Sequence, residues 1–135
     1  MKAKITDLQA APFVQDPNHV AASYIDRYAS SGLPVHIAVH HVVAEANGDD
    51  YCNPHSHDGE DEINILIGDG LRYRFELDGE TRIVDAPATV FMPAGCVHSA
   101  NVVSGRGQYI CVRFQSAAQT AAPAADTTLA ETETA

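Results

Sequence analysis

Basic residues are scarce in this sequence, and long apolar runs are missing. Its 135 residues contain 8 Lys and Arg against 18 Asp and Glu, which gives a formal net charge of -10 at pH 7. A negative field of this kind repels polyanions, so we expect no nucleic-acid partner and no anionic membrane surface. No stretch approaches the ~20 consecutive apolar residues of a membrane-spanning helix. The opening "MKAKITDLQAAPF" lacks the apolar core of a secretory signal.

Cysteine is scarce as well. The three cysteines, Cys52, Cys96 and Cys111, are odd in number and match no zinc-ribbon or C-x-x-C spacing. The sequence therefore predicts a reduced, cytoplasmic protein, in which Cys52 and Cys111 have no role beyond packing. The length suits one domain with a single core.

The first region, residues 1–33, has the signals of one amphipathic helix at about 17–30. Asp16 suits the N-cap, Pro17 suits the first helical position, and Gly32 followed by Pro34 provides a stop. Four apolar or aromatic residues fall at helical spacing on one face: Val20, Tyr24, Ile25 and Tyr28. On this helix His19 would be exposed.

The second region, residues 34–115, is typical of consecutive strands. Short segments rich in β-branched residues are separated by Gly- and Pro-containing turns; they are "PVHIAVHHVVAE", "EINILIG", "LRYRFELDGE", "TRIVDA", "ATVFMPAG" and "QYICVRFQ". This pattern predicts an all-β domain, an antiparallel sandwich or barrel. Asp78-Gly79 predicts a tight hairpin turn.

The last region, residues 116–135, is rich in Ala and Thr and has three acids, no Lys or Arg and almost no large apolar residue. Such a segment buries too little surface to offset the entropy of ordering, so we expect a disordered tail. An Ala-rich terminal helix is the alternative.

The stretch "NPHSHDGEDEINILIGDG" at 53–70 contains the chemistry of greatest interest. If this segment is extended, His55 and His57 point to the same side, because alternate residues of a strand share a face. A nearby carboxylate and the distant His98 of "PAGCVHSAN" would complete a nitrogen and oxygen ligand set. Such a set suits Fe(II), Mn, Zn, Ni or Cu. A chance surface pair beside a solvated acidic loop is the alternative.

Two segments resemble the paired motifs of the cupin family, G-(x)5-H-x-H-(x)3,4-E-(x)6-G and G-(x)5-P-x-G-(x)2-H-(x)3-N. They are "GDDYCNPHSHDGEDEINILIGDG" and "PATVFMPAGCVHSAN", and the resemblance spans about residues 35–115. It implies a single antiparallel cupin β-barrel of the double-stranded β-helix or jelly-roll type. It also implies one divalent transition metal inside, held by His55, His57, Glu62 and His98. Cupins of this size are usually dimeric.

The sequence departs from the family pattern at three positions. Six residues rather than five separate Gly48 from His55, Pro87 replaces the glycine that opens the second motif, and Asn101 comes one residue early. None of these changes removes a ligand. A degenerate, metal-free cupin is the alternative.

The motif spacing permits either Asp61 or Glu62 as the acidic ligand. Glu62 shares its strand face with Asn64 and Leu66, whereas Asp61 shares its face with three isoleucines, Ile63, Ile65 and Ile67. A buried Asn64 needs a hydrogen-bond partner, which a polar site around a metal would provide. Strand parity therefore favours Glu62.

Four residues are candidates for the substrate pocket, each with a structural alternative. Asn64 would orient a ligand or be a structural amide, and Tyr73 would line the pocket or belong to the core. Of the adjacent His40 and His41, we expect His41 to face the pocket as an acid or base, the alternative being a core or interface histidine. Arg113 would pair with a substrate carboxylate or with a surface acid.

The resemblance and the ligand set together predict a metal-dependent enzyme acting on a small polar organic molecule. With Fe(II), which we favour, it would be a dioxygenase. With Zn, Mn or Ni it would be a Lewis-acid isomerase, cyclase or lyase, and Cu is a further ion that the ligand set could hold. A non-catalytic small-molecule-binding or sensor cupin is the remaining class. The segment "VHIAVHHVV" at 35–43 is apolar on both faces and must be covered on both, so we also expect a homodimer.

Overall fold

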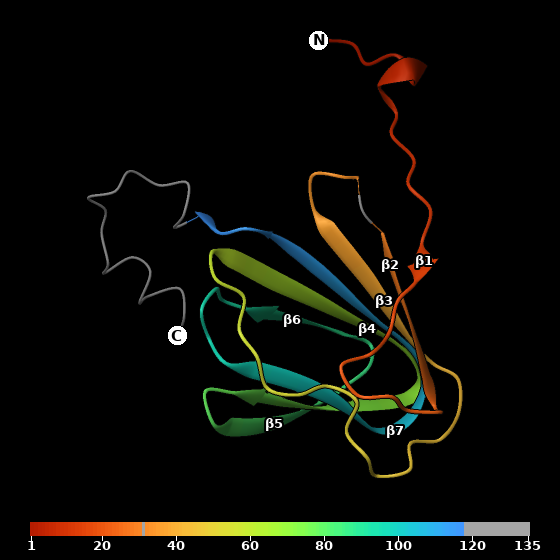
Figure 1. The fold of residues 1–135 in the computed structure, drawn as a ribbon, viewed down its shortest axis with the longest axis vertical. Coiled ribbons are helices and arrows are strands. Elements are labelled where there is room, and N and C mark those ends of the chain that lie inside the picture. The colour runs from red at the N-terminus through yellow and green to blue at the C-terminus, as the bar shows by residue number, and fades with distance from the viewer. Residues whose placement is uncertain (31, 118–135) are drawn as a thin grey trace, which may run out of the picture.

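The computed structural model describes residues 1–30 and 32–117, which form an antiparallel β-structure (Figure 1). A three-residue 3-10 helix, Ile5–Asp7, stands near the N-terminus. The strands are β1 (Val14–Gln15), β2 (Ile25–Ser30), β3 (His36–Val42), β4 (Glu60–Leu77), β5 (Glu80–Asp85), β6 (Ala88–Met92) and β7 (His98–Gln115). The predicted all-β class is confirmed. The two segments expected to form separate strands at 62–68 and 71–80 join into the single strand β4.

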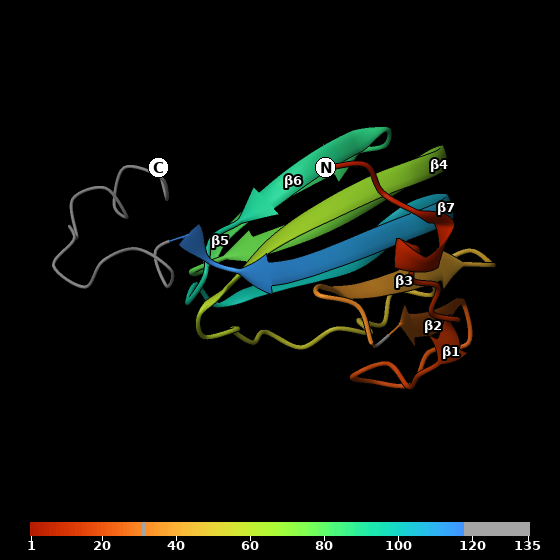
Figure 2. The same ribbon diagram turned by 90° about the horizontal axis from the view of Figure 1, so that it is seen from above.

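Strands β4 and β7 pair along almost their whole length and form the central strand pair of the fold. The first half of β4 lies between β6 and the second half of β7, and the sheet continues from β7 through β3 and β2 to β1. The second half of β4 lies between the first half of β7 and β5. The pairing register shifts between Asp69 and Arg72, where the long pair bends. The bend produces two facing layers (Figures 1 and 2).

Glycines make this bend possible. A Cβ atom on Gly105 would lie 2.1 Å from the carbonyl oxygen of Gly70, so the two crossing strands approach too closely for any side chain. Gly105 also has φ +84, a backbone conformation that suits glycine. The predicted hairpin turn is confirmed at Asp78-Gly79, where both residues have positive φ.

The predicted helix at about 17–30 is wrong. Residues 25–30 form β2, which pairs with β3 from Ile25 opposite Val42 to Ser30 opposite Ile37. The apparent cap, Asp16, accepts a hydrogen bond from Arg27 of β2 instead. Backbone pairing along the free edge of β3 therefore overrides a helical pattern whose local signals are weak.

The core lies between the layers and is rich in tyrosine. Tyr73 of β4 is fully buried, stacks on Tyr109 of β7 at a ring-centroid distance of 4.7 Å, and shares a 2.9 Å hydrogen bond with the Tyr51 hydroxyl. Within residues 1–30 and 32–117, no helix is both long and apolar enough to cross a membrane. The predicted disordered tail lies almost wholly outside the described residues.

Candidate metal centre

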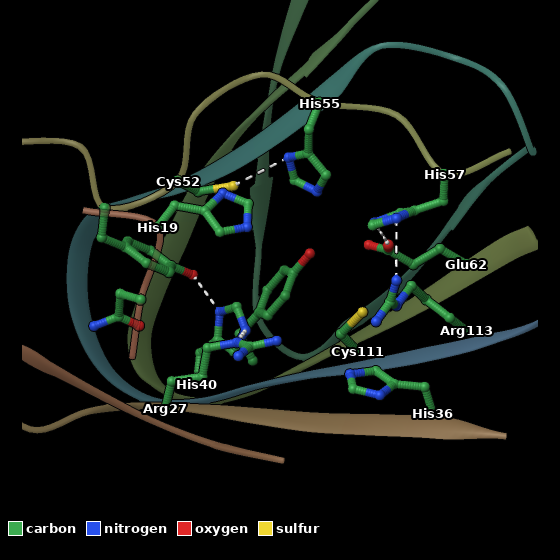
Figure 3. Close-up of a pocket in the computed structure, with 13 residues that line it drawn as sticks. His19, Arg27, His36, His40, Cys52, His55, His57, Glu62, Cys111 and Arg113 are labelled. Atoms are coloured by element: carbon green, nitrogen blue, oxygen red, sulfur yellow. Dashed lines mark hydrogen bonds and ion pairs between the residues drawn. The ribbon is translucent and has the colours of Figure 1, made fainter. Parts of the chain in front are cut away.

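Three histidines meet where the loop before β4 crosses the start of β7. His55 and His98 form an isolated β-bridge, with backbone N–O distances of 2.9 and 2.7 Å. The carbonyl of His57 accepts the N–H of Gly95 at 3.2 Å, which holds the loop against the β6–β7 turn. One ring nitrogen of each histidine lies within 4.8 Å of the others. Figure 3 shows two of them, His55 and His57, on the loop before β4. The segment is thus a loop with one bridge, not the strand that the i, i+2 argument assumed, yet its imidazoles still converge.

Glu62, the third residue of β4, completes this group. Its Oε1 lies 3.5 Å from Nε2 of both His57 and His98, and only 4% of its surface is exposed. Its Oε2 accepts a 2.8 Å hydrogen bond from the amide of Asn64. Asp61 faces elsewhere and accepts the backbone N–H of Ala94 at 2.9 Å. The structure therefore brings Glu62, and not Asp61, to the histidines; we call His55, His57, Glu62 and His98 the His/Glu site.

The electrostatics of the His/Glu site favour the forms that bind metals. Burial, together with the charge of Arg113, lowers the pKa of His57 to about 4. Burial by itself would raise the pKa of Glu62, but the His98 imidazole and the Asn64 amide more than offset it and hold the pKa at about 2. At neutral pH these pKa values leave the His57 imidazole neutral and the Glu62 carboxylate ionised, which are the forms that metal ligation requires.

Backbone carbonyls orient two of the rings. Nδ1 of His55 lies 2.7 Å from the carbonyl oxygen of Asn53, and Nδ1 of His98 lies 3.3 Å from that of Cys96. Each Nδ1–H is therefore the donor, which leaves each Nε2 with a lone pair for a cation. Nε2 of His98 is buried and has no hydrogen-bond partner within the described part of the chain. A bound divalent metal would satisfy this atom, so the residues present fit such an ion.

A cavity of about 260 Å³ opens onto the His/Glu site (Figure 3). Its lining is unusually rich in histidine, arginine and thiol groups: Asn18, His19, Arg27, His36, His40, Tyr51, Cys52, His55, His57, Glu62, Tyr109, Cys111 and Arg113. Nη1 of Arg113 donates to Nδ1 of His57 at 3.0 Å. Nε of Arg27 donates to Nε2 of His40 at 3.2 Å. Both guanidinium groups also pair with a carboxylate: Arg27 with Asp16, and Arg113 with Glu60 at 3.5 Å.

The four residues predicted for the substrate pocket have different outcomes. Arg113 lines the cavity, whereas Asn64 and Tyr73 lie behind it, the first against Glu62 and the second against Tyr51. The placement of His41 in the pocket is wrong. His41 is exposed and points away from the cavity, because neighbouring strand residues face opposite sides, and His40 lines the cavity instead.

Several lining residues had no signal in the sequence. Arg27 lies on β2, directly opposite His40 of β3. Because the sequence predicts a helix in this region, it gives no indication that Arg27 reaches the cavity. His19 was expected on the exposed face of that helix. Cys52 and Cys111 had been expected only to pack, yet both line the cavity.

Comparisons by structure find proteins of similar fold, whereas comparisons by sequence find no match. No protein-family model and no curated protein matches the sequence. The solved structure of KdgF from Halomonas sp. is similar, with a TM-score of 0.55, 17% identity and coverage of 78% of this chain and 92% of that one. An RmlC-like cupin from Shewanella frigidimarina has a TM-score of 0.52 and 13% identity, with coverage of 79% and 98%.

A structure of FeII HppE is also similar. It has a TM-score of 0.55 and 14% identity, and the match covers 84% of this chain and 60% of that one. At such identities the likeness carries the fold alone. Together with the antiparallel two-layer sheet, these matches identify the fold of this chain as that of the cupin superfamily.

Proposed function

We propose that this protein is a metal-dependent cupin enzyme that binds a small, polar, anionic molecule beside the His/Glu site, with a non-haem Fe(II) oxygenase as the first candidate. The observation that carries the proposal is the convergence of three imidazoles and one buried carboxylate at the base of a cavity. FeII HppE, a structure of similar fold, contains Fe(II) by its name, and this makes iron the first ion to test.

The four residues of the His/Glu site would hold one metal ion. Such a site supplies dioxygen activation when the ion is Fe(II), or polarisation of a carbonyl when it is Zn, Mn or Ni. The oxygenase and the Lewis-acid isomerase, cyclase or lyase therefore differ in the ion and not in the protein ligands.

Arg113 would select an anionic substrate. In the structure its guanidinium donates to Nδ1 of His57, which requires the ring proton to be on Nε2. Ligation through Nε2 would move this proton to Nδ1, and two donors would then face each other. Arg113 would be released toward the cavity, where its planar fork can pair with a carboxylate or a phosphonate. Arg27, on the opposite wall, adds a second positive charge.

Metal analysis of protein purified without chelator tests the His/Glu site. We expect about one equivalent of metal in the wild type, and loss of at least about tenfold in affinity for His57→Ala and Glu62→Gln, since even an outer partner of a metal ligand is worth ~10–100-fold. Asp61→Asn is the matched control and should retain the metal. Retention by Glu62→Gln with loss by Asp61→Asn would refute the assignment.

Substrate screening then separates the activities. Oxygen uptake with small carboxylates or diketones would support the oxygenase, whereas conversion without oxygen uptake would support Lewis-acid chemistry. Tight binding of the metal and of a small molecule, with no conversion of it, would favour the non-catalytic sensor.

We also propose that the chain forms a homodimer through the outer face of the β3–β7–β4–β6 sheet. Ile37, Val112, Ile63 and Phe91 are neighbours in one row across these four strands. Val39, Ile110 and Ile65 form the next row. They alternate with inward residues such as Glu62 and Asn64, so they face away from the cavity. Phe91 is 48% exposed, and a second copy would cover it.

Sedimentation equilibrium tests the dimer. The wild type should have twice the monomer mass, and Ile65→Glu should be monomeric because it places a charge in the interface. Ile83→Glu on β5, where the isoleucine is 47% exposed, is the control and should remain dimeric. A monomeric wild type would exclude the homodimer.

A further inference from the structure

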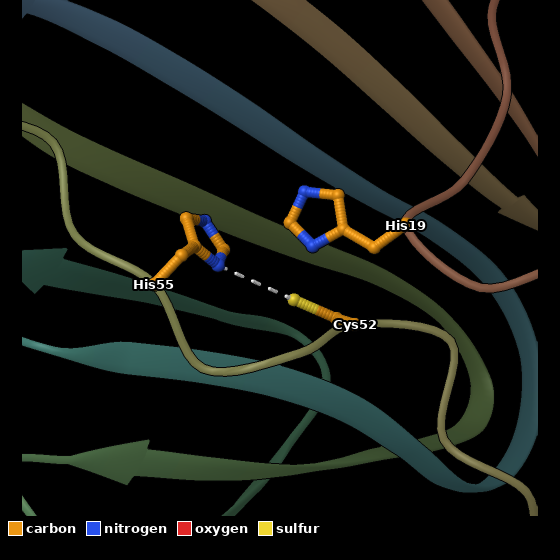
Figure 4. A group of neighbouring side chains, drawn as sticks. All are labelled: His19, Cys52 and His55. Atoms are coloured by element: carbon orange, nitrogen blue, oxygen red, sulfur yellow. Dashed lines mark hydrogen bonds between the residues drawn. The ribbon is translucent and has the colours of Figure 1, made fainter.

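A second group of metal-binding side chains lies at the mouth of the cavity. His19, Cys52 and His55 each offer one ligand atom, and these atoms lie within 4.8 Å of one another (Figure 4). Sγ of Cys52 is 3.9 Å from Nδ1 of His55. The rings of His19 and His55 meet edge to face, at a centroid distance of 4.6 Å. We call these three residues the thiol cluster.

Buried hydrogen bonds hold the backbone of the thiol cluster in place. Oδ1 of Asn101 accepts the N–H groups of both Tyr51 and Cys52 at 2.9 Å, and its Nδ2 donates to the Cys52 carbonyl at 3.0 Å. The N–H of Val20 donates to the Tyr51 carbonyl at 3.1 Å, which fixes the loop of His19 beside Cys52. Asn101 is 1% exposed. The backbone segments that carry the three ligands are thus positioned before any ion binds.

The ligand chemistry differs from that of the His/Glu site. A thiolate is a soft ligand that selects Zn²⁺ and similar thiophilic ions, whereas the carboxylate of Glu62 suits harder ones. Two imidazole nitrogens and one sulfur also form the three-ligand set of an open tetrahedral zinc site. We propose that the thiol cluster binds one thiophilic divalent cation, and that the Cys52 thiol releases its proton to solvent as the cation binds.

His55 belongs to both groups. Its Nδ1 faces Cys52 and the Asn53 carbonyl, which leaves Nε2 for the His/Glu site. A cation in the thiol cluster replaces the proton on Nδ1 of His55 and ends its hydrogen bond to Asn53. This proton moves to Nε2, or goes to solvent when a metal in the His/Glu site already holds Nε2. Substitutions should therefore fall into three classes: Cys52 and His19 affect only the thiol cluster, Glu62 affects only the His/Glu site, and His55 affects both.

Titration of the chelator-treated full chain with Co²⁺, followed by competition with Cd²⁺, tests the proposal. The wild type should develop the near-ultraviolet absorption of thiolate-to-cobalt charge transfer. Cys52→Ser should lose this absorption and bind Cd²⁺ at least about tenfold more weakly. His19→Asn, a change at an exposed side chain, should weaken Cd²⁺ binding without affecting folding. Circular dichroism establishes that each variant is folded.

Two control variants show which thiol and which metal site produce the charge-transfer absorption. Cys111→Ser removes another thiol of the same cavity and should leave the absorption unchanged, as should Glu62→Gln. Absorption that persists in Cys52→Ser or disappears in Cys111→Ser would overturn the proposal, as would its absence from the folded wild type. An unchanged Cd²⁺ affinity of His19→Asn would also overturn it. A Glu62→Gln variant that keeps all its metal would refute the His/Glu site while the thiol cluster stands.

Discussion

His40 should make the stability of this protein fall in mild acid, because it is buried as a neutral imidazole. Its Nε2 accepts a hydrogen bond from Nε of Arg27 at 3.2 Å, so its ring proton is on Nδ1, which donates to the Tyr51 hydroxyl at 2.8 Å. A second proton would have to be added at Nε2, directly against a guanidinium. Burial and the charge of Arg27 accordingly lower the pKa of His40 from 6.5 to about 3.

The magnitude follows from proton linkage. A lowered pKa means that the unfolded chain binds the proton first, so stability is complete above pH 6.5 and is lost as the pH falls toward about 3. Each pH unit in this window costs about 1.4 kcal/mol for one proton. Between pH 7.5 and 4.5 the contribution of His40 is therefore about 3 kcal/mol.

Urea unfolding of chelator-treated protein at several pH values measures this contribution. His40→Gln removes the titrating group and should decrease the acid-induced loss of unfolding free energy by about 3 kcal/mol relative to the wild type. Other histidines titrate in both proteins and cancel in the difference. His41→Gln, on the same strand but exposed, is the matched control for the substitution itself. Parallel curves for His40→Gln and the wild type would refute the reasoning.

Three further predictions concern the bend, the Asn101 clamp and Arg113. In urea denaturation, Gly105→Ala should lower the unfolding free energy by more than about 3 kcal/mol, because left-handed strain adds to a backbone clash at 2.1 Å. Gly79 has a similar φ but open space around it, so Gly79→Ala should lower the unfolding free energy by only about 1–2 kcal/mol in the same assay. Asn101→Ala should lower the unfolding free energy by about 2–4 kcal/mol, because it leaves the backbone N–H groups of Tyr51 and Cys52 unpaired. Asn47→Ala, at an exposed asparagine, is the control and should lower it by less than about 1 kcal/mol. In metal-free Arg113→Gln, NMR titration should find the pKa of His57 raised above its value of about 4, while an unchanged value would exclude Arg113 as a cause.

The sequence was sufficient to predict features that depend on spacing along one strand. The alternation of Glu62 with Asn64 and Leu66 predicted which acid faces inward, and the Asp78-Gly79 pair predicted its turn. Features that depend on which strands pair could not be derived this way. Arg27 reaches the cavity only because β2 pairs with β3, and local signals at Asp16 and Pro17 favoured a helix instead. The choice between His40 and His41 depends on which face of β3 turns toward the cavity, and the continuous apolar pattern of that strand leaves this open.

The His/Glu site itself depends on the bend in the β4–β7 pair. Glu62 pairs with Arg113 near one end of this ribbon, whereas His98 pairs with Leu77 at the other end. Fifteen residues of extended strand separate Glu62 from Leu77, so in a flat ribbon Glu62 and His98 would be roughly 50 Å apart. In the structure Oε1 of Glu62 lies 3.5 Å from Nε2 of His98. The fold closes this distance by bending at residues 68–71 of β4 and their partners in β7, where Gly105 permits the close approach of the strands. Gly105→Ala should therefore weaken metal binding as well as stability, although it lies far from every ligand in the pairing register. Gly79→Ala, at the hairpin turn, should leave the metal affinity unchanged, and equal metal affinities for the two variants would show that the bend does not control the site.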